Sequence, residues 1–428
     1  MLTRFVLPLA LLAAPLAAEP PAPATADVPN PSPALQQAGE GVAGVLLGTK
    51  PAEEVFSPQF LAAVSPAQLK ALIDQIAAQF GPLEGLESVT PTGPGRGTIA
   101  LRFGKAVYSG PFVIGPDGKV VGLLLNDYRP LGDDVAAIER DIAALAGTAG
   151  VLYAPLEGGT TRIAVNADRQ FAIGSAFKLY VLAMLARQVE TGMRRWDDVV
   201  RIDDVRSLPS GQMQDWPKNA PVTLHTLATM MISISDNTAT DQLIHLLGRE
   251  TIAKEVRDSG HAAPDRMLPL LTTREMFALK ADPARGAAYA GMSEPQQAVA
   301  LEALAQEIAA DPASAKVPSF AAPSLIDSVE WFASPQDLRK VLEQIAALKD
   351  PTARSILAVN PSIPAPRRGD WAYAGYKGGS EPGVLNLTWL LQKPGGAWWV
   401  LTISQNDLAK PIDNASLELL VQRILALP

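Results

Sequence analysis

The segment from Leu179 to Leu185 is almost entirely apolar and directly follows Ser175 and Lys178. Its composition predicts a long helix that passes through the middle of a domain, with Ser175 at the helix N-terminus. Because residues three apart lie on one helical face, we expect the Ser175 hydroxyl and the Lys178 amine to be neighbours. A nucleophile in that place also feels the positive end of the helix dipole. Ser-x-x-Lys alone is frequent by chance, so it gains meaning only from its context.

Two further segments supply that context. Ser235-Asp236-Asn237 follows an amphipathic stretch at 222–232, and Lys377-Gly378-Gly379-Ser380 precedes a strand-like run at 384–391. With Ser175-x-x-Lys178, these elements resemble, in order and context, the Ser-x-x-Lys, Ser-Asp-Asn and Lys-Thr-Gly elements of the class A β-lactamases and penicillin-binding proteins. The resemblance covers about residues 135–428.

The resemblance implies an α/β (α+β) catalytic domain, in which a five-stranded antiparallel sheet is flanked by helices. The residues agree with this expectation. Segments 150–153 and 162–165 are typical of paired strands, and the Pro394-Gly395-Gly396 turn between two apolar runs indicates a hairpin. Apolar residues at helical spacing from Leu417 to Leu427 predict a last helix that packs across the sheet.

The resemblance also implies catalytic roles. Ser175 would attack a carbonyl carbon and form an acyl-enzyme. Lys178 is a candidate for the group that removes the serine proton, provided that burial and the nearby charge of Lys377 keep it neutral. Ser235 would bridge the two lysines and pass the proton toward the leaving nitrogen.

A second set of residues is expected to bind substrate. Asn237 would hold a substrate amide, and Lys377, Gly379 and Ser380 would bind the substrate on the strand side, with the lysine and the serine facing its carboxylate. The backbone N–H groups of Ser175 and Ser380 would form the oxyanion hole. For Asp236, a structural role in the turn is the better interpretation.

The sequence departs from the family pattern in two places. Gly378 replaces the residue that often carries a hydroxyl, and no Glu-x-x-Leu-Asn segment supplies the glutamate that class A enzymes use in deacylation. Glu275 and Glu330 are the nearest candidates by chain position, although each fits a salt bridge or a helix cap better. Asp241 stands where class A enzymes usually have an Asn beside that glutamate. We therefore expect acylation to outrun deacylation unless another base is present.

Three functions stay open at this point. The first is a β-lactamase that hydrolyses cyclic amides, and the second is a D-Ala-D-Ala carboxypeptidase or esterase of the same fold. The third is a binding protein that keeps the fold without the catalysis. The substrate would be a small β-lactam or a peptidoglycan-like molecule.

Composition narrows the possible partners and cofactors. The 428 residues contain 36 Lys and Arg against 44 Asp and Glu, a net charge of −8, which argues against nucleic acid or an anionic membrane as partner. The chain has no Cys and three His, so disulfides, thiolate sites and a histidine-rich metal centre are not expected. The proposed chemistry needs no cofactor or metal.

The N-terminal part predicts export and a separate small domain. Residues 1–18 have the charged, apolar and small-residue order of a secretory signal, with an uncleaved anchor as the alternative. Cleavage would leave a periplasmic or secreted protein without a membrane span. Residues 19–37 are rich in Pro and Ala and predict an extended linker. Residues 38–130 predict a cystatin-like or nuclear-transport-factor-like α+β domain, with a helix opened by Ser65-Pro66 and a meander of strands at 98–125.

Residues 272–327 are expected to be an insertion beside the active site. The stretch is rich in Ala and Pro, and Glu294–Ala309 predicts a helix within it. It takes the place of a shorter omega-shaped loop in the family. A long loop at the rim of a cleft is often functional, although simple decoration is an equal alternative.

Overall fold

The computed structural model describes residues 31–131, 134–203, 206–311, 314–363 and 365–427. The predicted signal segment and residues 19–30 of the predicted linker lie outside these ranges. The chain divides into two compact units, one containing the described residues up to Asp134 and the other Val135–Ile424. Each is described by itself.

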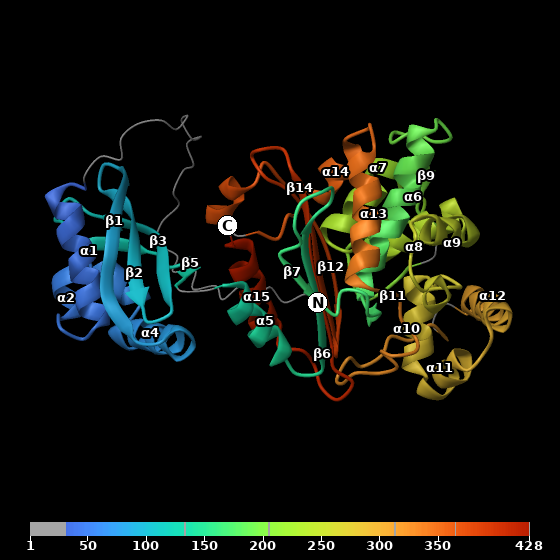
Figure 1. Ribbon diagram of the computed structural model, residues 1–428, viewed down its shortest axis with the longest axis horizontal. Coiled ribbons are helices and arrows are strands. Elements are labelled where there is room, and N and C mark those ends of the chain that lie inside the picture. Colours follow the sequence, from blue (N-terminus) through green and yellow to red (C-terminus); the bar gives the residue numbers. More distant parts are fainter. Residues whose placement is uncertain (1–30, 132–133, 204–205, 312–313, 364, 428) are drawn as a thin grey trace. The chain divides into compact units, whose positions relative to one another are not determined.

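The first unit is an antiparallel sheet covered by helices. Its elements are α1 (Pro33–Leu46), α2 (Ala52–Val55), α3 (Pro58–Ala63), α4 (Pro66–Phe80), β1 (Leu83–Gly93), β2 (Arg96–Phe103), β3 (Ala106–Ile114), β4 (Val120–Leu123) and β5 (Asp127–Pro130). The strand order is β1-β2-β3-β4, and β5 pairs with β3. Figure 1 shows this unit in blue and cyan.

Local capping explains where the helices of the first unit begin. The predicted helix at Ser65 is confirmed as α4, and Ser65 and Gln68 form a capping box at its start. The α1 helix begins at Pro33, capped by Ser32 and anchored by the buried Leu35. Residues 33–37 are therefore helical where the sequence predicts an extended linker. The helices α1 to α3 and the strand β1 are further elements that the sequence analysis did not predict.

The second unit is built on a five-stranded antiparallel sheet, as predicted. The strand order is β12-β13-β14-β6-β7. The strands are β6 (Thr148–Pro155), β7 (Ile163–Val165), β12 (Tyr373–Glu381), β13 (Val384–Gln392) and β14 (Trp398–Asn406). The two central strands are almost wholly buried, because helices cover both faces of the sheet (Figure 1).

The helices of this unit lie on two sides of the sheet (Figure 1). On one side are α5 (Val135–Ala143) and α15 (Asn414–Leu425), the predicted last helix. The other side carries α6 (Lys178–Glu190), α7 (Leu224–Ser233), α8 (Asn237–Leu247), α9 (Arg249–Asp258), α10 (Thr273–Ala281), α11 (Pro283–Ala290), α12 (Glu294–Ala310), α13 (Pro335–Ala347) and α14 (Thr352–Leu357). Short strands β8 (Phe171–Ala172) and β11 (Phe332–Ala333) pair with each other, as do β9 (Val199–Arg201) and β10 (Pro221–Thr223). Short 3₁₀ helices are η1 (Gly174–Phe177), η2 (Met213–Asp215), η3 (Pro264–Arg266) and η5 (Ala365–Asp370).

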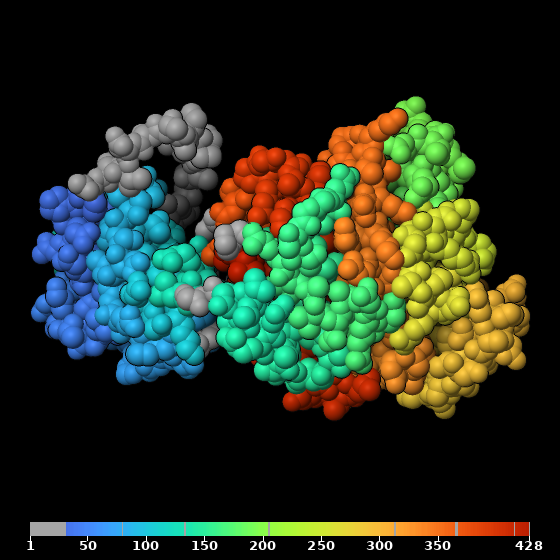
Figure 2. Space-filling view, viewed as in Figure 1, coloured from blue at the N-terminus to red at the C-terminus, as the bar shows by residue number. Residues whose placement is uncertain are grey.

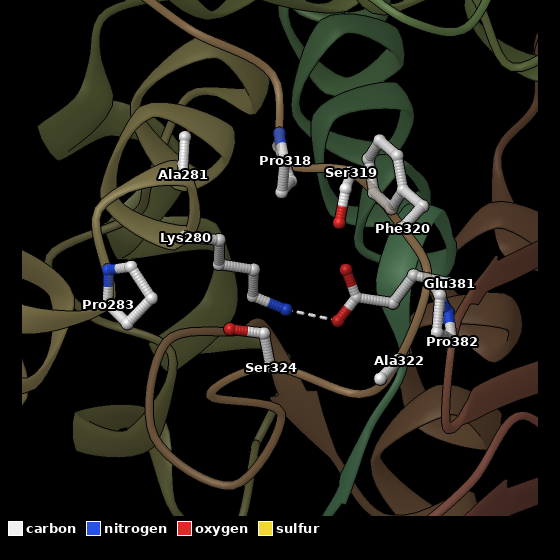
Figure 3. A pocket seen from close by; sticks show the side chains of 10 residues that line it. All are labelled: Lys280, Ala281, Pro283, Pro318, Ser319, Phe320, Ala322, Ser324, Glu381 and Pro382. Atoms are coloured by element: carbon white, nitrogen blue, oxygen red, sulfur yellow. Dashed lines mark hydrogen bonds and ion pairs between the residues drawn. The ribbon is translucent and has the colours of Figure 1, made fainter.

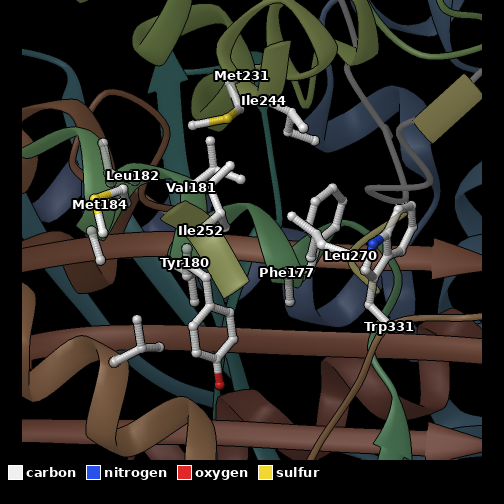
Figure 4. Close-up of a cluster of buried hydrophobic side chains, with 14 of the residues drawn as sticks. Phe177, Tyr180, Val181, Leu182, Met184, Met231, Ile244, Ile252, Leu270 and Trp331 are labelled. Atoms are coloured by element: carbon white, nitrogen blue, oxygen red, sulfur yellow. The ribbon is translucent and has the colours of Figure 1, made fainter. Parts of the chain in front are cut away.

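The core of the second unit forms around α6. Every residue from Lys178 to Ala186 is buried, which confirms the expected central helix. Phe177 stacks on Trp331 with ring centroids 3.8 Å apart (Figure 4). This stacking fixes the segment just before α6 against the chain that enters β11.

The predicted insertion is largely helical. The helix expected at Glu294–Ala309 is present as α12, and together with α10 and α11 it forms the lobe in yellow and orange at the lower right of Figure 2. Residues 314–325 then return along α10, where Phe320 contacts the Phe277 ring edge to face at 5.4 Å.

Candidate active site

Ser175 lies on η1, between β8 and α6, rather than on the first turn of an α-helix. The α-helix itself begins at Lys178. A 3₁₀ helix has three residues per turn, so Ser175 and Lys178 still lie on the same side. The tight turn is possible because Gly174 has φ +49°, in the left-handed region where a side chain would be strained. The backbone N–H of Ile173 donates to the Trp331 carbonyl at 3.0 Å and holds the start of the turn.

Lys178 is completely buried, and its side chain forms hydrogen bonds with Ser235, in the loop after α7, and with Asn237, at the start of α8. Its Nζ donates to the Ser235 carbonyl at 2.8 Å, to Ser235 Oγ at 3.2 Å and to Asn237 Oδ1 at 2.7 Å. Burial lowers the pKa of Lys178 to about 7, although Asp241 and Asp236 oppose the shift. The lysine can therefore be neutral at physiological pH.

Ser235 links the two lysines. Lys377 Nζ donates to Ser235 Oγ at 3.1 Å, and that oxygen lies 3.2 Å from Lys178 Nζ. Ser235 has φ +60°, an uncommon conformation for a residue other than glycine. Strain of this kind concentrates at sites where the surrounding structure fixes a side chain for function.

Lys377 lies on β12 and is also buried. Burial, and then the charge of Lys178, lower its pKa well below the usual range. Two buried lysines that share one hydroxyl repel each other, so the network favours a state in which at least one of them is neutral. The sequence predicted that the charge of Lys377 helps to keep Lys178 neutral; in the structure burial lowers the pKa of Lys178, and burial, followed by the charge of Lys178, lowers the pKa of Lys377.

Gly379 and Ser380 bring β12 against η1. A Cβ added at Gly379 would lie 2.1 Å from the Ile173 carbonyl oxygen and 2.4 Å from the Ser175 nitrogen. One added at Gly174 would lie 3.1 Å from the Ser380 nitrogen. The backbones of Ser175 and Ser380 therefore approach each other at the place expected for an oxyanion hole. The Ser380 side chain is exposed.

Asp236 and Asn237 begin α8 and have different surroundings. The Asp236 carboxylate accepts from the backbone N–H groups of Ala239 at 2.8 Å, Gln212 at 2.7 Å and Met213 at 2.8 Å. These bonds cap α8 and hold the loop before η2, in line with the structural role expected for this residue. Asn237 is buried against Lys178, with its amide nitrogen 3.5 Å from the Leu208 carbonyl oxygen.

The two candidate deacylation glutamates are both engaged in structural contacts. Glu275 forms a capping box with Thr272 at the start of α10 and an ion pair with Arg249 at 2.7 Å. Glu330 accepts from Lys280 at 3.1 Å and from the Trp331 N–H at 2.9 Å. Neither contact involves Ser175, Lys178 or Ser235.

A buried ionic cluster at the end of β12 was not predicted from the sequence. Lys280, at the end of α10, pairs with both Glu330 and Glu381, and the Lys280 and Glu381 side chains face one another in Figure 3. Burial, and then the charge of Glu330, raise the pKa of Glu381 well above its usual range. Alternation along the strand could have shown that Glu381 shares a face with Lys377 and Gly379. Its partner Lys280 comes from the insertion and has no signal in the sequence.

The role of Asp241 could not be predicted from its position in the motif. Its buried carboxylate accepts from Ser207 Oγ at 2.7 Å, from the Thr273 N–H and hydroxyl, both at 2.8 Å, and from the Arg274 N–H at 3.0 Å. Asp241 therefore fastens the start of α10 and the 206–216 loop to α8, one turn beyond Asn237.

Neither a metal centre nor a membrane span is found among the described residues. No group of three or more His, Asp or Glu side chains in these ranges could hold a metal ion. Among the same residues, no helix combines the length and the apolar character needed to cross a bilayer.

Comparison with known proteins finds a family model that matches this chain and solved structures that are similar to it. Similar solved structures include a beta-lactamase from Sphaerobacter thermophilus DSM 20745, with 23% identity, coverage of 68% of this chain and 93% of that chain, and a TM-score of 0.48. A beta-lactamase from Desulfarculus baarsii DSM 2075 has 18% identity, coverage of 69% and 98%, and a TM-score of 0.49. The protein PBP-A has 17% identity, coverage of 70% and 95%, and a TM-score of 0.46. No curated protein sequence matches the chain. The model of the beta-lactamase enzyme family matches residues 131–359, more than half of the chain, and the chain therefore belongs to this family.

Proposed function

We propose that the protein is a serine hydrolase of the class A β-lactamase type, which forms an acyl-enzyme on Ser175 and acts on the C–N bond of cyclic amides. The observation that carries this proposal is the position of Ser235 Oγ, 3.2 Å from Lys178 Nζ and 3.1 Å from Lys377 Nζ. A hydroxyl between two buried amines provides a path for a proton from the nucleophile to the leaving group.

In the acylation step, neutral Lys178 takes the proton of Ser175 as its oxygen attacks the carbonyl carbon of the substrate. The negative charge that develops on the carbonyl oxygen is met by the N–H groups of Ser175 and Ser380. When the C–N bond breaks, the proton moves from Lys178 through Ser235 to the leaving nitrogen. Because the pKa of Lys178 is about 7, both its neutral and its charged form are accessible at neutral pH.

Substrate would be bound on both sides of the Lys178–Ser235–Lys377 network. A substrate carboxylate beside Lys377 and Ser380 would favour the charged form of the lysine, which burial alone disfavours. Asn237 uses its carbonyl oxygen for Lys178, so its amide N–H₂ is the group that can donate to a substrate carbonyl. Gly379 supplies the close approach that lets β12 lie against the Ser175 turn.

A second candidate function is favoured by the engagement of both candidate glutamates. Glu275 and Glu330 hold Arg249 and Lys280, so neither is poised to activate water. With slow deacylation the protein would act as a penicillin-binding-protein-like D-Ala-D-Ala carboxypeptidase or esterase. A binding protein without catalysis is the third candidate.

Two further proposals concern the N-terminal part. We propose that residues 1–18 direct export to the periplasm or outside the cell, and that residues 38–130 form a domain separate from the hydrolase domain at 135–428. The substrate would then be met outside the cytoplasm, where β-lactams and peptidoglycan-like peptides occur.

The test mixes purified protein with benzylpenicillin and follows the intact mass over time. We expect an adduct of the penicillin mass on the wild type and on Ser355→Ala, which removes an exposed serine of the same unit, and none on Ser175→Ala. Turnover of a chromogenic cephalosporin, an aryl ester and a D-Ala-D-Ala peptide separates the three candidates. Rapid cephalosporin turnover favours the β-lactamase, a persistent adduct favours the second candidate, and failure of the wild type to form any adduct contradicts both.

A further inference from the structure

A buried ion cluster joins the predicted insertion to the end of β12, one residue after Ser380. Lys280 Nζ lies 3.1 Å from Glu330 Oε1 and also pairs with a carboxylate oxygen of Glu381. The side chains of the lysine and of the two glutamates are 1%, 0% and 7% exposed. Charges so well shielded from water are costly to bury and tolerate little change in geometry. The proposed chemistry uses none of these three side chains.

The three groups balance their charges by sharing one proton. A hydrogen bond joins the Glu330 and Glu381 carboxyl groups, and such a bond requires a proton on one of them. Burial alone would lower the pKa of Lys280, but the charges of the two glutamates outweigh it, so the pKa is raised and the lysine stays charged. One ammonium group therefore faces one carboxylate and one carboxylic acid.

The Glu330 side of the cluster reaches the turn that carries Ser175. The second oxygen of Glu330 accepts from the Trp331 N–H at 2.9 Å. The Trp331 carbonyl accepts from the Ile173 N–H at 3.0 Å, and the Trp331 ring stacks on Phe177 at 3.8 Å. Ile173 and Phe177 lie at the two ends of the turn. Glu330 thus fixes the segment that holds the proposed nucleophile.

The Glu381 side of the cluster reaches the opposite wall. The strand β12 is at the edge of the described sheet and pairs with β13 on one side. The end of such a strand opens more readily than the centre of a sheet. Glu381 is the last residue of β12, and alternation along the strand places its side chain on the face of Gly379. Its ion pair with Lys280 therefore anchors the strand end beside the Ser380 N–H.

The helix α10 connects this anchor to the other side of the lysine network. At its start, the Thr273 N–H and hydroxyl donate to Asp241 of α8, both at 2.8 Å. At its end lies Lys280. The nine residues of α10 span about 13 Å as one rigid element. The helix therefore sets the spacing between α8, which begins with Asn237, and β12, which carries Lys377.

The rest of the insertion shields the cluster from water. Residues 318–324 line a cavity of about 190 Å³ together with Lys280 and Glu381, whose side chains point toward one another in Figure 3. Pro323 lies against the turn after β12, where a Cβ added at Gly383 would be 2.8 Å from Pro323 Cγ. Exclusion of water strengthens the interaction between the charges.

We propose that Lys280 is a positioning residue for the proposed reaction: through Glu381 and Glu330 it holds β12 and the Ser175 turn at the separation that the oxyanion hole requires. The inference rests on the proposed function, because this separation matters for chemistry only if Ser175 is acylated. It assigns the insertion a role in the geometry of the acyl-transfer site.

The first experiment separates binding from chemistry. Rapid mixing with benzylpenicillin, followed by intact mass, gives the dissociation constant of the non-covalent complex and the maximal acylation rate. Lys280→Met keeps most of the side-chain length and removes the cation. We expect a maximal acylation rate at least about tenfold lower, with a dissociation constant within about twofold of the wild-type value, because the oxyanion hole acts in the transition state.

A second readout reports on the oxyanion hole itself. Benzylpenicillin labelled with ¹³C at the β-lactam carbonyl allows the ester carbonyl band of the adduct to be found in infrared difference spectra of the first turnover. Hydrogen bonds to the carbonyl oxygen lower its stretching frequency. The adduct of Lys280→Met should therefore absorb at a higher wavenumber than that of the wild type, whereas a mere loss of stability would leave the band in place.

Further variants test the geometry of the cluster. Glu381→Gln has the shape of the protonated acid and can bond to both partners, so its maximal acylation rate should stay within about threefold of the wild-type value. Glu381→Ala removes the anchor and should resemble Lys280→Met. The control Arg285→Met breaks an exposed ion pair within the insertion, at 2.8 Å from Glu307, and should match the wild type.

The outcomes distinguish the inference from the proposed function. A wild-type rate and carbonyl band in Lys280→Met would overturn the inference and leave the proposed function standing. Glu381→Gln as slow as Glu381→Ala, or an equal loss in Arg285→Met, would do the same. If Lys280→Met does not fold, the comparison of Glu381→Gln with Glu381→Ala decides. Absence of any adduct on the wild type would overturn both.

Discussion

Replacing Gly379 by Ala tests whether the contact between β12 and the Ser175 turn matters for chemistry. The added Cβ would lie 2.1 Å from the Ile173 carbonyl oxygen and 2.4 Å from the Ser175 nitrogen. Both neighbours are backbone atoms, so no side-chain rotation can relieve the overlap. Reaching even the shortest contact that real Cβ atoms show, 3.0 Å, requires β12 and η1 to separate by about 1 Å. A displacement of this size at reacting groups costs about 100-fold in rate.

The matched control is Gly395→Ala, in the hairpin turn between β13 and β14. Nothing lies within 4 Å of a Cβ added there. We expect Gly379→Ala to form the benzylpenicillin adduct about 100-fold more slowly than the wild type and to lose about 1–3 kcal/mol of unfolding free energy through overpacking. Gly395→Ala should match the wild type in both. Thermal unfolding of each variant checks that it is folded under the conditions of the acylation assay. An acylation rate of Gly379→Ala close to that of the wild type would refute the placement of the oxyanion site.

Four further predictions concern pH, capping and deacylation. The acylation rate should rise as the pH is raised through about 7, because burial lowers the pKa of Lys178 to about 7 and its neutral form is the base. Stopped-flow or mass measurements check this, and a rate that does not change between about pH 5 and about pH 9 would speak against it. The same shift implies that the unfolded state binds more protons than the folded state above pH 7, so this group makes the protein more stable as the pH rises from about 7 toward the unfolded lysine value. Asp236→Ala should lower the unfolding free energy by about 2–4 kcal/mol, because it leaves buried N–H groups unpaired. The control Asp282→Ala, which removes an exposed helix cap, should lower it by about 1 kcal/mol. Chemical denaturation measures both losses, and equal losses would contradict the structural role of Asp236. Glu275→Gln and Glu330→Gln should each leave the lifetime of the penicillin adduct within about twofold of the wild-type value. If the adduct of one variant lives at least about 100-fold longer, that glutamate is the deacylation base.

The motif residues could be located from the sequence because each motif is short and lies at the end of a regular element. Lys178, Ser235 and Lys377 meet as expected, since the apolar pattern predicted the central helix and the sheet that hold them. The start of α6 was predicted less well. The sequence pattern does not distinguish a 3₁₀ turn from the first turn of an α-helix, and the turn at Ser175 is fixed by Gly174 and by the distant Trp331.

The rest of the site depends on contacts between residues far apart in the chain. Glu381 and Lys280 are separated by the whole of α11 to α14, and nothing in their local sequence signals an ion pair. Asp241 gains its role from Ser207, which lies on a loop, and from Thr273, the first residue of α10. In the first unit, α1 was missed because a Pro- and Ala-rich composition is also typical of linkers. Its cap at Ser32 and the buried Leu35 are visible only once the fold is known.

A crystal structure of the protein after reaction with benzylpenicillin tests the central claim most directly. The account predicts continuous density from Ser175 Oγ to the penicilloyl carbonyl carbon, with the carbonyl oxygen within hydrogen-bond distance of the Ser175 and Ser380 nitrogens. Lys178, Ser235 and Lys377 should keep their hydrogen bonds to one another beside the acyl group. A covalent bond at any other residue, or an acyl group on Ser175 whose carbonyl oxygen points away from β12, would contradict the account.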